Sequence, residues 1–415
     1  MPVVPDPKTS SNCEQTSCEL TLNIGLYPDV PRLEQFKETI IKEWEKKHPH
    51  IELVFQSWWD GGYKKEPKNL DLFIFDGVFL EDYINKGYLL PLKENDINDF
   101  DDLLYYAKEG VKDKRSQEYF GIPQIACRSL LFYRKDDVEL QRANSLSNLS
   151  KVIGKSTFDT VLPPQGEGLM IDFSSETTNG YYYLEAIEYI SKENLQGDLR
   201  DKKRNTHASC PIANISHLRQ LTSIKHASDA NINRAEKFSL GFGRAYVGYS
   251  ESMTSLDAKT RNEIEFKYLP FSDNDNVSHF YTDIVGIHPK VLGKKMEKYT
   301  LDLANMLTST KTFINATCAT SKNPVLQYLL PVRHNTFKTM SKKYPIYSKF
   351  YNLLIGSSDV RLFKMKKGAA LWLNKNKQRI TKRIFEYNQK AKYSQIKQNH
   401  SLFFSFKNKH SRSTF

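Results

Sequence analysis

The apolar run Asp71-Leu-Phe-Ile-Phe75 constrains the fold more than any other stretch of the sequence. A near-continuous apolar strand, without alternation, is typical of a parallel sheet that is covered on both faces. Ahead of this run, residues Leu20–Leu26 and Ile51–Phe55 predict two further strands, and an apolar stripe over Arg32–Lys47 predicts a helix between them. This β-α-β-β order predicts a doubly wound α/β domain.

Three chemically useful groups follow the carboxyl ends of these strands. Tyr27 comes after the first strand, the aromatic, glycine-rich loop Trp58–Tyr63 after the second, and Asp76 directly after the third. In open α/β sheets, ligands bind beyond the carboxyl ends of the strands. We therefore expect these residues near one binding site, although Asp76 and the glycine after it could also form a simple turn.

The run Gly121–Arg134 carries the most informative cysteine. Its Gly-Ile-Pro entry, β-favouring interior and polar end predict one long buried strand that starts after Pro123. Cys127 lies a few residues into this strand beside Arg128, and a neighbouring positive charge favours the nucleophilic thiolate. The alternative is that Cys127 is a small buried apolar residue, as most free cysteines are.

The rest of the chain alternates between predicted strands and helices, without an internal repeat. The stretch Arg244–Glu251 predicts a strand that ends in polar residues, which is another place for a site. Further strands are expected at 160–162, 264–268 and 281–287. Helices are expected at 80–84, 96–110, 181–190, 215–227, 233–240, 301–307, 322–330, 346–354 and 369–386.

Charge is distributed unevenly along the 415 residues. The net charge is +12, and 15 lysines and arginines against two acids fall between Gly356 and Phe415. The preceding part is close to neutral, so the composition does not favour a nucleic-acid-binding surface, and the basic end is interpreted as a solvated tail. The sequence contains no apolar run of transmembrane length.

The five cysteines show neither a disulfide framework nor a metal-binding spacing. Cys13 and Cys18 could pair with each other in an oxidising compartment, whereas Cys210 and Cys318 are interpreted as structural. No metal or cofactor is expected. The first 20 residues lack the hydrophobic core of a signal peptide.

Motifs spread along the chain resemble a known family. The first strand, the helix with Trp44 before His48-Pro49, and the strand Ile51–Phe55 resemble the bacterial extracellular solute-binding proteins. Within that group, residues 20–355 look specifically like thiaminase I (thiamine pyridinylase). The motifs of this resemblance are Leu26-Tyr27-Pro28-Asp29-Val30-Pro31, Leu70–Asp76, Lys86–Pro91, Gly121–Cys127, Tyr249-Ser-Glu251 and Tyr281-Thr-Asp283.

The resemblance implies an α/β fold of the periplasmic-binding-protein type, in which two lobes enclose a ligand cleft. Residues 20–126 and about 282–330 are expected in one lobe, and residues 127–281 and about 331–388 in the other. Residues 1–19 are expected to form a flexible leader, and residues 389–415 a basic, disordered tail.

The resemblance also implies roles for individual residues. In that family the cysteine after Gly-Ile-Pro-Gln is the nucleophile, which makes Cys127 the candidate nucleophile, and Glu251 corresponds to the general base. Asp29 departs from the family pattern, in which an aromatic residue usually follows the proline of this turn. The residues expected to bind the substrate are Tyr27, Trp58, Tyr63, Asp76, Tyr249, Tyr281 and Asp283, of which Tyr281 and Asp283 line the pyrimidine site.

The function that the resemblance implies is a transferase that cleaves thiamine. A cysteine thiolate adds to the pyrimidine, the thiazolium leaves the methylene carbon, and an amine, pyridine or thiol takes its place. Thiamine and this small nucleophile are the expected partners, without nucleic acid or a membrane span, and the protein is expected to be a monomer. The family is typically exported, although no leader is visible in this sequence.

Two alternatives remain at this point. The first is a non-catalytic solute-binding protein with the same fold, which would hold thiamine or a related small molecule. A receptor of this kind would need neither Cys127 nor Glu251. The second is a cysteine hydrolase, in which His334 would have to pair with Cys127.

Overall fold

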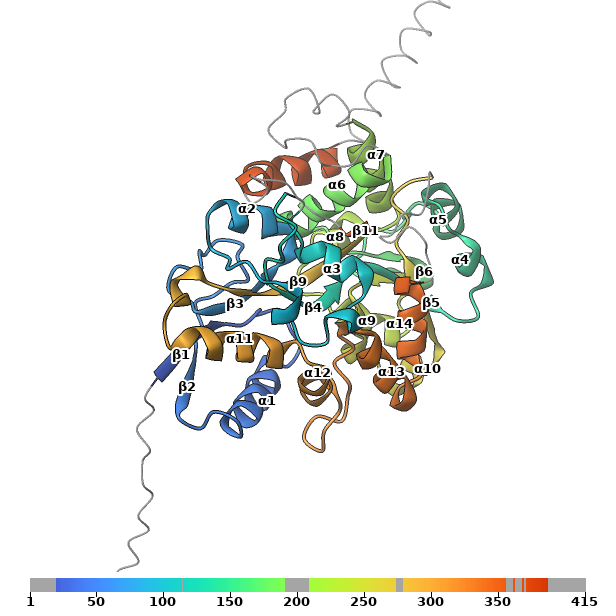
Figure 1. Ribbon diagram of the computed structural model, residues 1–415. Coiled ribbons are helices and arrows are strands. Elements are labelled where there is room, and N and C mark those ends of the chain that lie inside the picture. The colour runs from blue at the N-terminus through green and yellow to red at the C-terminus, as the bar shows by residue number, and fades with distance from the viewer. Residues whose placement is uncertain are drawn as a thin grey trace, which may run out of the picture.

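The computed structural model describes residues 20–113, 115–190, 209–273, 279–355, 361–362, 368 and 371–386. These residues form two β-sheets, each covered by helices, which lie in separate halves of the molecule (Figure 1). The predicted two-lobed α/β fold is therefore confirmed. Cys13, Cys18 and the basic end after residue 386 lie outside the described residues, and the residue boundaries of the lobes stay a prediction.

The first sheet contains the strands that the sequence predicts at the N-terminus. Strand β1 pairs in parallel with both β2 and β3, and β9 runs antiparallel between β3 and β4. All five residues of β3 are buried, as expected for a strand that is covered on both faces. In sheet order the strands are β10 (Leu330–Pro331), β4 (Ile122–Cys127), β9 (His279–Ile287), β3 (Leu72–Asp76), β1 (Leu20–Gly25) and β2 (Ile51–Phe55), with β11 (Arg361–Leu362) also paired to β9.

The second sheet is smaller and mostly antiparallel. Its central strand β5 pairs antiparallel with β7 and β8, while β6 pairs in parallel with β7. In sheet order the strands are β6 (Gln165–Met170), β7 (Gly243–Gly248), β5 (Leu130–Arg134) and β8 (Ile264–Tyr268).

The prediction of one strand over Gly121–Arg134 is wrong. The chain forms β4 in the first sheet, leaves it at Arg128 and Ser129, and enters the second sheet as β5. Both strands are apolar and buried, so the sequence pattern does not reveal the break between them. Cys127 therefore ends a strand at the point where the chain crosses between the two sheets.

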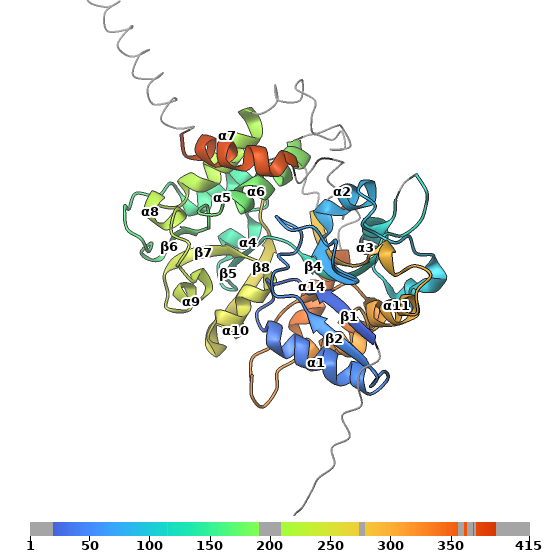
Figure 2. The ribbon, with the colours of Figure 1, turned by 90° about the vertical axis from the view of Figure 1, so that its left-hand side faces the viewer.

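Helices cover both sheets, and the last described helix, residues 371–386, lies over α6 and α7 (Figure 2). Phe350 of α14 stacks on Phe266 of β8, with ring centroids 4.5 Å apart, which attaches this helix to the second sheet. The helices are α1 (Leu33–Glu45), α2 (Leu80–Asn85), α3 (Tyr105–Val111), α4 (Val138–Arg142), α5 (Leu146–Ile153), α6 (Glu176–Ile190), α7 (Ser209–Gln220), α8 (Ile224–Ala227), α9 (Arg234–Ser239), α10 (Ala258–Glu263), α11 (Met296–Leu307), α12 (Thr310–Thr317), α13 (His334–Lys343) and α14 (Ile346–Ile355).

Two further predicted elements are wrong for reasons of local chemistry. The strand expected at 160–162 is a bend, and β6 begins only at Gln165, after two prolines that cannot donate to a sheet. The segment expected to be a helix at 322–330 is irregular chain with bends, because Pro324 disfavours helix before it and Tyr328 takes a left-handed φ of 57°. Gln327 instead bonds through its side chain to the carbonyl of Ala316 at 2.7 Å.

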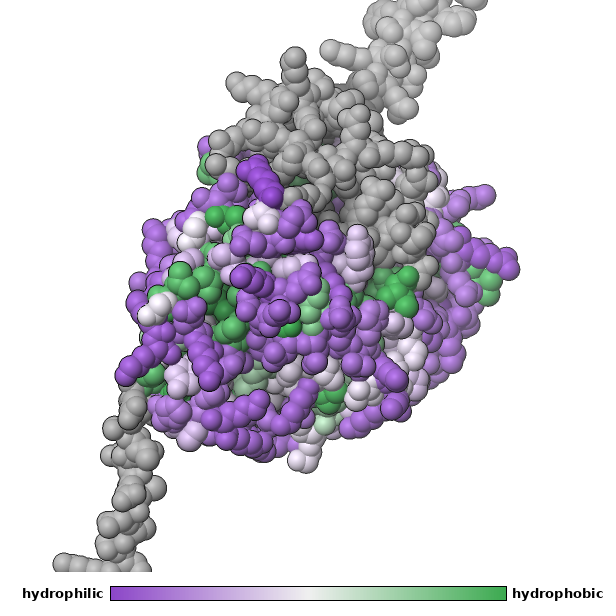
Figure 3. Space-filling view, viewed as in Figure 1, coloured by the Kyte–Doolittle hydropathy of each residue, from purple (hydrophilic) through white to green (hydrophobic). Residues whose placement is uncertain are grey.

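The surface is consistent with the near-neutral composition of the main body. On the face shown in Figure 3, hydrophilic residues dominate and hydrophobic residues form small, separate areas. Among the described residues, no helix combines the length and the apolar character needed to cross a membrane.

Candidate active site

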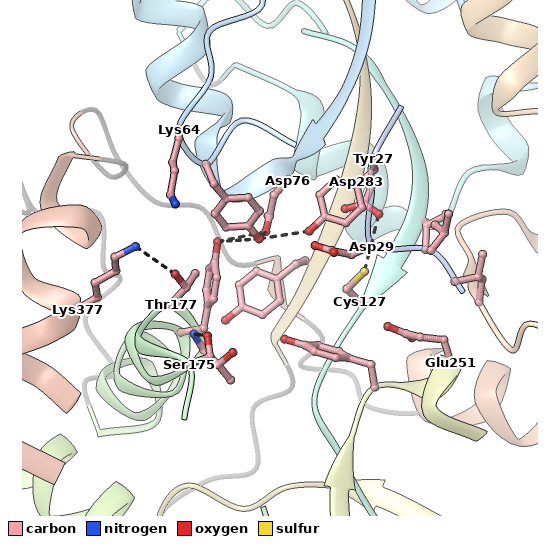
Figure 4. Close-up of a pocket in the computed structure, with 18 residues that line it drawn as sticks. Tyr27, Asp29, Lys64, Asp76, Cys127, Ser175, Thr177, Glu251, Asp283 and Lys377 are labelled. Carbon is pink, nitrogen blue, oxygen red and sulfur yellow. Dashed lines mark hydrogen bonds between the residues drawn. The ribbon is translucent and has the colours of Figure 1, made fainter. Parts of the chain in front are cut away.

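A cavity of about 390 Å³ lies between the two sheets and is lined by residues from both (Figure 4). Its volume falls in the range of roughly 300–1,000 Å³ that is usual for small-molecule sites. The lining residues are Tyr27, Asp29, Val30, Tyr63, Lys64, Asp76, Ile125, Cys127, Ser175, Thr177, Thr178, Tyr181, Tyr249, Glu251, Tyr281, Asp283, Leu329 and Lys377.

Strand register brings the central residues of the site together. Asp76 at the end of β3 lies directly opposite Asp283 of β9, and Cys127 at the end of β4 lies opposite Tyr281 of β9. Directly opposite residues of an antiparallel pair point to the same face, and so do residues two apart on one strand. Tyr281 and Asp283 therefore share a face with both partners, and the four side chains form one wall of the cavity.

Cys127 is enclosed by carboxyl groups. Its Sγ lies 4.0 Å from Oδ2 of Asp283, which is a long hydrogen bond from the thiol to the carboxyl group. Burial raises the pKa of the thiol well above its usual range, and the nearby carboxylates of Asp283 and Glu251 raise it further. In these surroundings the sulfur is therefore a protonated thiol at neutral pH.

The expectation that Arg128 favours a thiolate at Cys127 is wrong. The guanidinium of Arg128 is buried and lies over the ring of Tyr268, 4.0 Å from its centroid. The charges that act on the thiol pKa come from acids instead, and they act in the opposite direction. A neighbour in sequence at the end of a strand points to the other face, so sequence adjacency misleads here.

Glu251 approaches the sulfur from the second sheet. Strand β7 ends at Gly248, and the chain turns into a 3₁₀ helix over Ser250–Ser255 that carries Glu251 into the cavity (Figure 4). Burial raises the pKa of its carboxyl group to about 7. A carboxyl group that titrates near neutral pH can accept a proton in one step of a reaction and return it in another.

Asp76 is held by tyrosines from both lobes. Its Oδ2 accepts hydrogen bonds from Tyr63 at 2.8 Å and from Tyr181 of α6 at 3.1 Å, while its Oδ1 accepts the backbone N–H of Val78 at 3.1 Å. The hydroxyl groups of Tyr63 and Tyr27 lie 3.2 Å apart and extend this network. Burial raises the pKa of Asp76, although these hydrogen bonds oppose the shift. Asp76 is thus both the start of a turn and a site residue.

Glu185 lies behind the cavity wall. It is buried on α6, and its Oε1 accepts a hydrogen bond from the hydroxyl of Tyr281 at 2.9 Å. Burial raises the pKa of Glu185 to about 7, although the charge of Arg128 and the bond from Tyr281 oppose the shift. This hydrogen bond joins α6 to β9 and fixes the orientation of a residue that lines the cavity.

Most of the residues predicted to form the site meet in this cavity. Trp58 is the exception, because it is 38% exposed and bonds to Gln56 rather than lining the cavity. His334, the partner needed for a cysteine hydrolase, bonds to Tyr351 at 2.8 Å and is not among the lining residues. The residues brought together as predicted are Tyr27, Tyr63, Asp76, Cys127, Tyr249, Glu251, Tyr281 and Asp283.

Sequence reasoning misses the residues contributed by helices. The apolar pattern identifies Tyr181 and Glu185 of α6 only as part of an ordinary helix, and Lys377 lies beyond the part of the chain covered by the family resemblance. Lys64 belongs to no motif, although it follows Tyr63 directly. The aspartate at position 29, which departs from the family pattern, lines the cavity as well.

Comparison with known proteins agrees with this geometry. A family model described as the thiaminase-1 domain matches residues 128–272. Thiaminase-1 of Paenibacillus thiaminolyticus is 32% identical over 367 residues, which cover 87% of this chain and 88% of that protein. The chain belongs to the thiaminase I family.

Solved structures of thiaminase I have the same fold. The structure of Clostridium botulinum thiaminase I in complex with thiamin superimposes with a TM-score of 0.80 at 33% identity, covering 89% of this chain and 100% of that one. A maltotriose-binding protein of Thermus thermophilus matches with a TM-score of 0.57 at 14% identity, covering 88% and 98% of the two chains. The latter likeness concerns the fold alone: thiaminase I shares its two-lobed architecture with solute-binding proteins.

Proposed function

We propose that this protein cleaves thiamine by transferring its pyrimidine methylene group from the thiazolium to a small nucleophile. The observation that carries the proposal is the meeting of Cys127, Glu251 and Asp283, from three distant parts of the chain, in one cavity. Membership of the thiaminase I family supports the same reaction. The nucleophile is proposed to be an amine, a pyridine or a thiol, and the protein is proposed to act as a monomer.

The aminopyrimidine is proposed to bind against Asp283. Burial, followed by the charges of Asp76 and Glu251, raises the pKa of Asp283 well above its usual range, which favours the neutral form of this carboxyl group. A neutral carboxyl group can donate its O–H to a ring nitrogen while its other oxygen accepts from the exocyclic amine. The tyrosines that line the cavity offer flat apolar faces for the ring.

The first half of the proposed reaction forms a carbon–sulfur bond. The sulfur of Cys127 adds to an electron-poor ring carbon, its proton moves to Glu251, and the ring nitrogen takes a proton from Asp283. The positive charge of the bound thiazolium also favours the thiolate that the surrounding acids disfavour. The bond between the methylene carbon and the thiazolium nitrogen then breaks, and the bonding pair leaves with a neutral thiazole.

The second half reverses the addition. The incoming nucleophile forms a bond to the methylene carbon, and the sulfur leaves the ring with its electron pair and recovers a proton from Glu251. The ring proton returns to Asp283. Covalent attachment thereby divides one difficult displacement into two easier ones.

Glu251 suits the role of base better than Asp283, although Asp283 is the acceptor of the thiol hydrogen bond. A base must be ionised before the reaction, and the pKa of Glu251 near 7 leaves a large fraction of it ionised at neutral pH. At Asp283, burial and the charges of Asp76 and Glu251 together favour the protonated form, which suits a proton donor. We therefore assign proton removal to Glu251 and proton donation to Asp283.

Release of thiazole from thiamine tests the proposal directly. The protein is mixed with thiamine and aniline or pyridine, and Cys127→Ser is expected to lower kcat by at least about 10³-fold. Calorimetry should show that the variant still binds thiamine, because the cavity is otherwise intact.

Cys318→Ser provides the matched control. Cys318 lies outside the cavity, with its sulfur 3.7 Å from that of Met340, and this variant should retain activity. Unchanged turnover in Cys127→Ser would remove the cysteine from its role. Tight thiamine binding without thiazole release by the unmodified protein would identify it as a solute-binding protein instead.

A further inference from the structure

Two lysines lie at the end of the cavity opposite Cys127. Lys64 follows β2 in the first lobe, and Lys377 belongs to the helix over residues 371–386. In Figure 4 their ammonium groups approach the same region, beside Thr177 and Ser175, while Cys127 and Glu251 lie on the other side of the tyrosine rings. These two lysines and two hydroxyl residues are called the lysine end of the cavity below.

The packing of its helix fixes the position of Lys377. Trp372 stacks on Tyr183 of α6, with ring centroids 6.0 Å apart, and Asn179 of α6 donates to the hydroxyl of Thr381 at 3.0 Å. On this support, the ammonium of Lys377 donates to the hydroxyl of Thr177 at 3.3 Å. The lysine is thus anchored at the wall of the cavity, and the hydrogen atom of the Thr177 hydroxyl remains available for a ligand.

The loop that carries Lys64 is also held in place. The carboxylate of Asp60 accepts the backbone N–H groups of Gly62 at 3.2 Å, Lys64 at 2.9 Å and Lys65 at 3.2 Å. The side chain of Lys64 is exposed and borders the cavity. Within the described part of the chain, neither Lys64 nor Lys377 forms an ion pair with a carboxylate.

The charges of the cavity are therefore separated along its length. Asp29, Glu251 and Asp283 lie on the side of the thiol, the two lysines lie at the other end, and Asp76 lies between them. If the pyrimidine of thiamine contacts Asp283, the part of the cavity toward the lysines is left for the thiazolium and its hydroxyethyl arm. Two ammonium groups repel a cationic ring, unless the arm itself carries a negative group.

We propose that the lysine end binds an anionic group, and that the group is the phosphate of a thiamine phosphate ester. This proposal rests on the proposed function, since it places the leaving group of that reaction. Lys64 and Lys377 neutralise the phosphate, and the hydroxyls of Ser175 and Thr177 donate to its oxygens. The phosphate leaves with the thiazole, and no step of the chemistry at Cys127 changes.

The lysine end could instead bind an anionic group on the incoming nucleophile. Two pairs of compounds distinguish an anion on the substrate from an anion on the nucleophile. Thiamine and thiamine monophosphate are compared as substrates with pyridine as the nucleophile. Aniline and 4-aminobenzenesulfonate are compared as nucleophiles with thiamine as the substrate. In each pair the readout is the ratio of kcat/KM for the anionic compound to kcat/KM for the neutral one.

The test variants are Lys64→Met and Lys377→Met, which remove the charge and keep most of the side-chain volume. Each is expected to lower the phosphate ratio by about tenfold, near the lower end of what loss of one hydrogen bond to a charged group costs. Lys65→Met and Lys375→Met are the matched controls, because both residues are exposed, lie one or two residues from the test positions in the same segments and do not line the cavity. The controls change the net charge equally and should leave the ratio unaltered.

Binding provides a readout that is independent of turnover. In a Cys127→Ser background, Lys377→Met should lower the binding affinity for thiamine monophosphate more than the affinity for thiamine. In Cys127→Ser itself, added salt should lower the affinity for the phosphate ester more than the affinity for thiamine. A fall confined to the 4-aminobenzenesulfonate ratio would assign the anion site to the nucleophile. If neither ratio responds to the lysine variants while thiamine is still cleaved, the proposed anion site is wrong and the proposed function stands.

Discussion

The cavity has two sides of different origin. On the strand side, β3, β4, β9 and the turn after β7 carry the residues to which we assign the chemistry. On the helix side, α6 and the helix over residues 371–386 contribute hydrogen bonds and charges. The strand side could be predicted from local motifs, whereas the helix side could not. We infer that reaction chemistry and its support are encoded in different ways in this chain.

The helix side is built on a single stripe of α6. Thr177, Tyr181 and Glu185 are spaced four residues apart, so they lie on one face of the helix. This face contacts Lys377, Asp76 and Tyr281 in turn. Asp76 and Tyr281 belong to strands β3 and β9 of the first sheet, so α6 contacts that sheet directly at the cavity.

Substitution of Glu251 by glutamine should have the largest effect among the predictions that compare the two sides. Removing a general base typically costs about 10²–10⁴-fold in rate, and the amide of a glutamine at this position could not take the proton of the thiol. Because the pKa of Glu251 is raised to about 7 in the free protein, kcat/KM of the unmodified protein should rise with pH up to about 7 and then level off. The measurement is kcat/KM for thiazole release between about pH 5 and about pH 9, a range that brackets this pKa.

Glu251→Gln should lose the rise in rate below about pH 7, which we call the acidic limb, together with most of its activity. Asp283→Asn is the comparison within the strand side, since it removes the proton donor and keeps the thiol and Glu251. That variant should be slower than the unmodified protein and retain the limb near the pKa of Glu251. If Glu251→Gln keeps its rate while Asp283→Asn abolishes it, the base has been assigned to the wrong carboxyl group.

The contrast between the two sides explains how much could be read from the sequence. The strands at 51–55 and 264–268 have the predicted bounds, and Asp76 follows its apolar strand as expected. Strand ends are recognisable because hydrophobic runs stop there, and the fold class then brings these ends together. The family motifs for Cys127, Glu251 and Asp283 add roles that the local pattern alone does not provide.

The remainder depends on contacts between distant segments. The run Tyr181-Tyr182-Tyr183 contains one ring that faces the cavity, while Tyr182 packs on Phe271 and Tyr183 on Trp372. Since α6 is buried on more than one face, its sequence does not show which tyrosine faces the substrate. The break between β4 and β5 is hidden for the same reason, as each half pairs with strands distant in sequence.

Substitution of Glu185 should have an intermediate effect on KM for thiamine. Two substitutions distinguish the role of its hydrogen bond from the role of its charge. In Glu185→Ala, Tyr281 loses its acceptor, and KM for thiamine should rise by about fivefold to tenfold with a smaller change in kcat. Glu185→Gln keeps an oxygen that can accept from Tyr281, and its KM should remain close to that of the unmodified protein. Equal defects in both variants would mean that Glu185 acts through its charge.

The stability of Glu185→Gln and that of the unmodified protein should depend differently on pH. Glu185 has an ordinary pKa of about 4.5 in the unfolded chain and a pKa of about 7 in the folded protein. Between these values the folded state binds the extra proton, so this residue makes stability fall as pH rises from about 4.5 to about 7. The Tm of Glu185→Gln should therefore gain on that of the unmodified protein across this interval, and a constant difference would contradict the raised pKa.

Substitution of Tyr181 by phenylalanine should have the smallest effect. The change removes the 3.1 Å hydrogen bond to Asp76, but Asp76 keeps its bonds from Tyr63 and Val78, so its carboxyl group stays satisfied. A loss of about 1 kcal/mol is expected for one neutral donor to a buried carboxyl, seen as a KM about fivefold higher. Tyr183 of the same helix packs on Trp372, away from the cavity. Tyr183→Phe is therefore the control and should not change KM. If Tyr181→Phe instead lowers kcat as strongly as Glu251→Gln, the helix side takes part in the chemistry, and the division between the two sides does not hold.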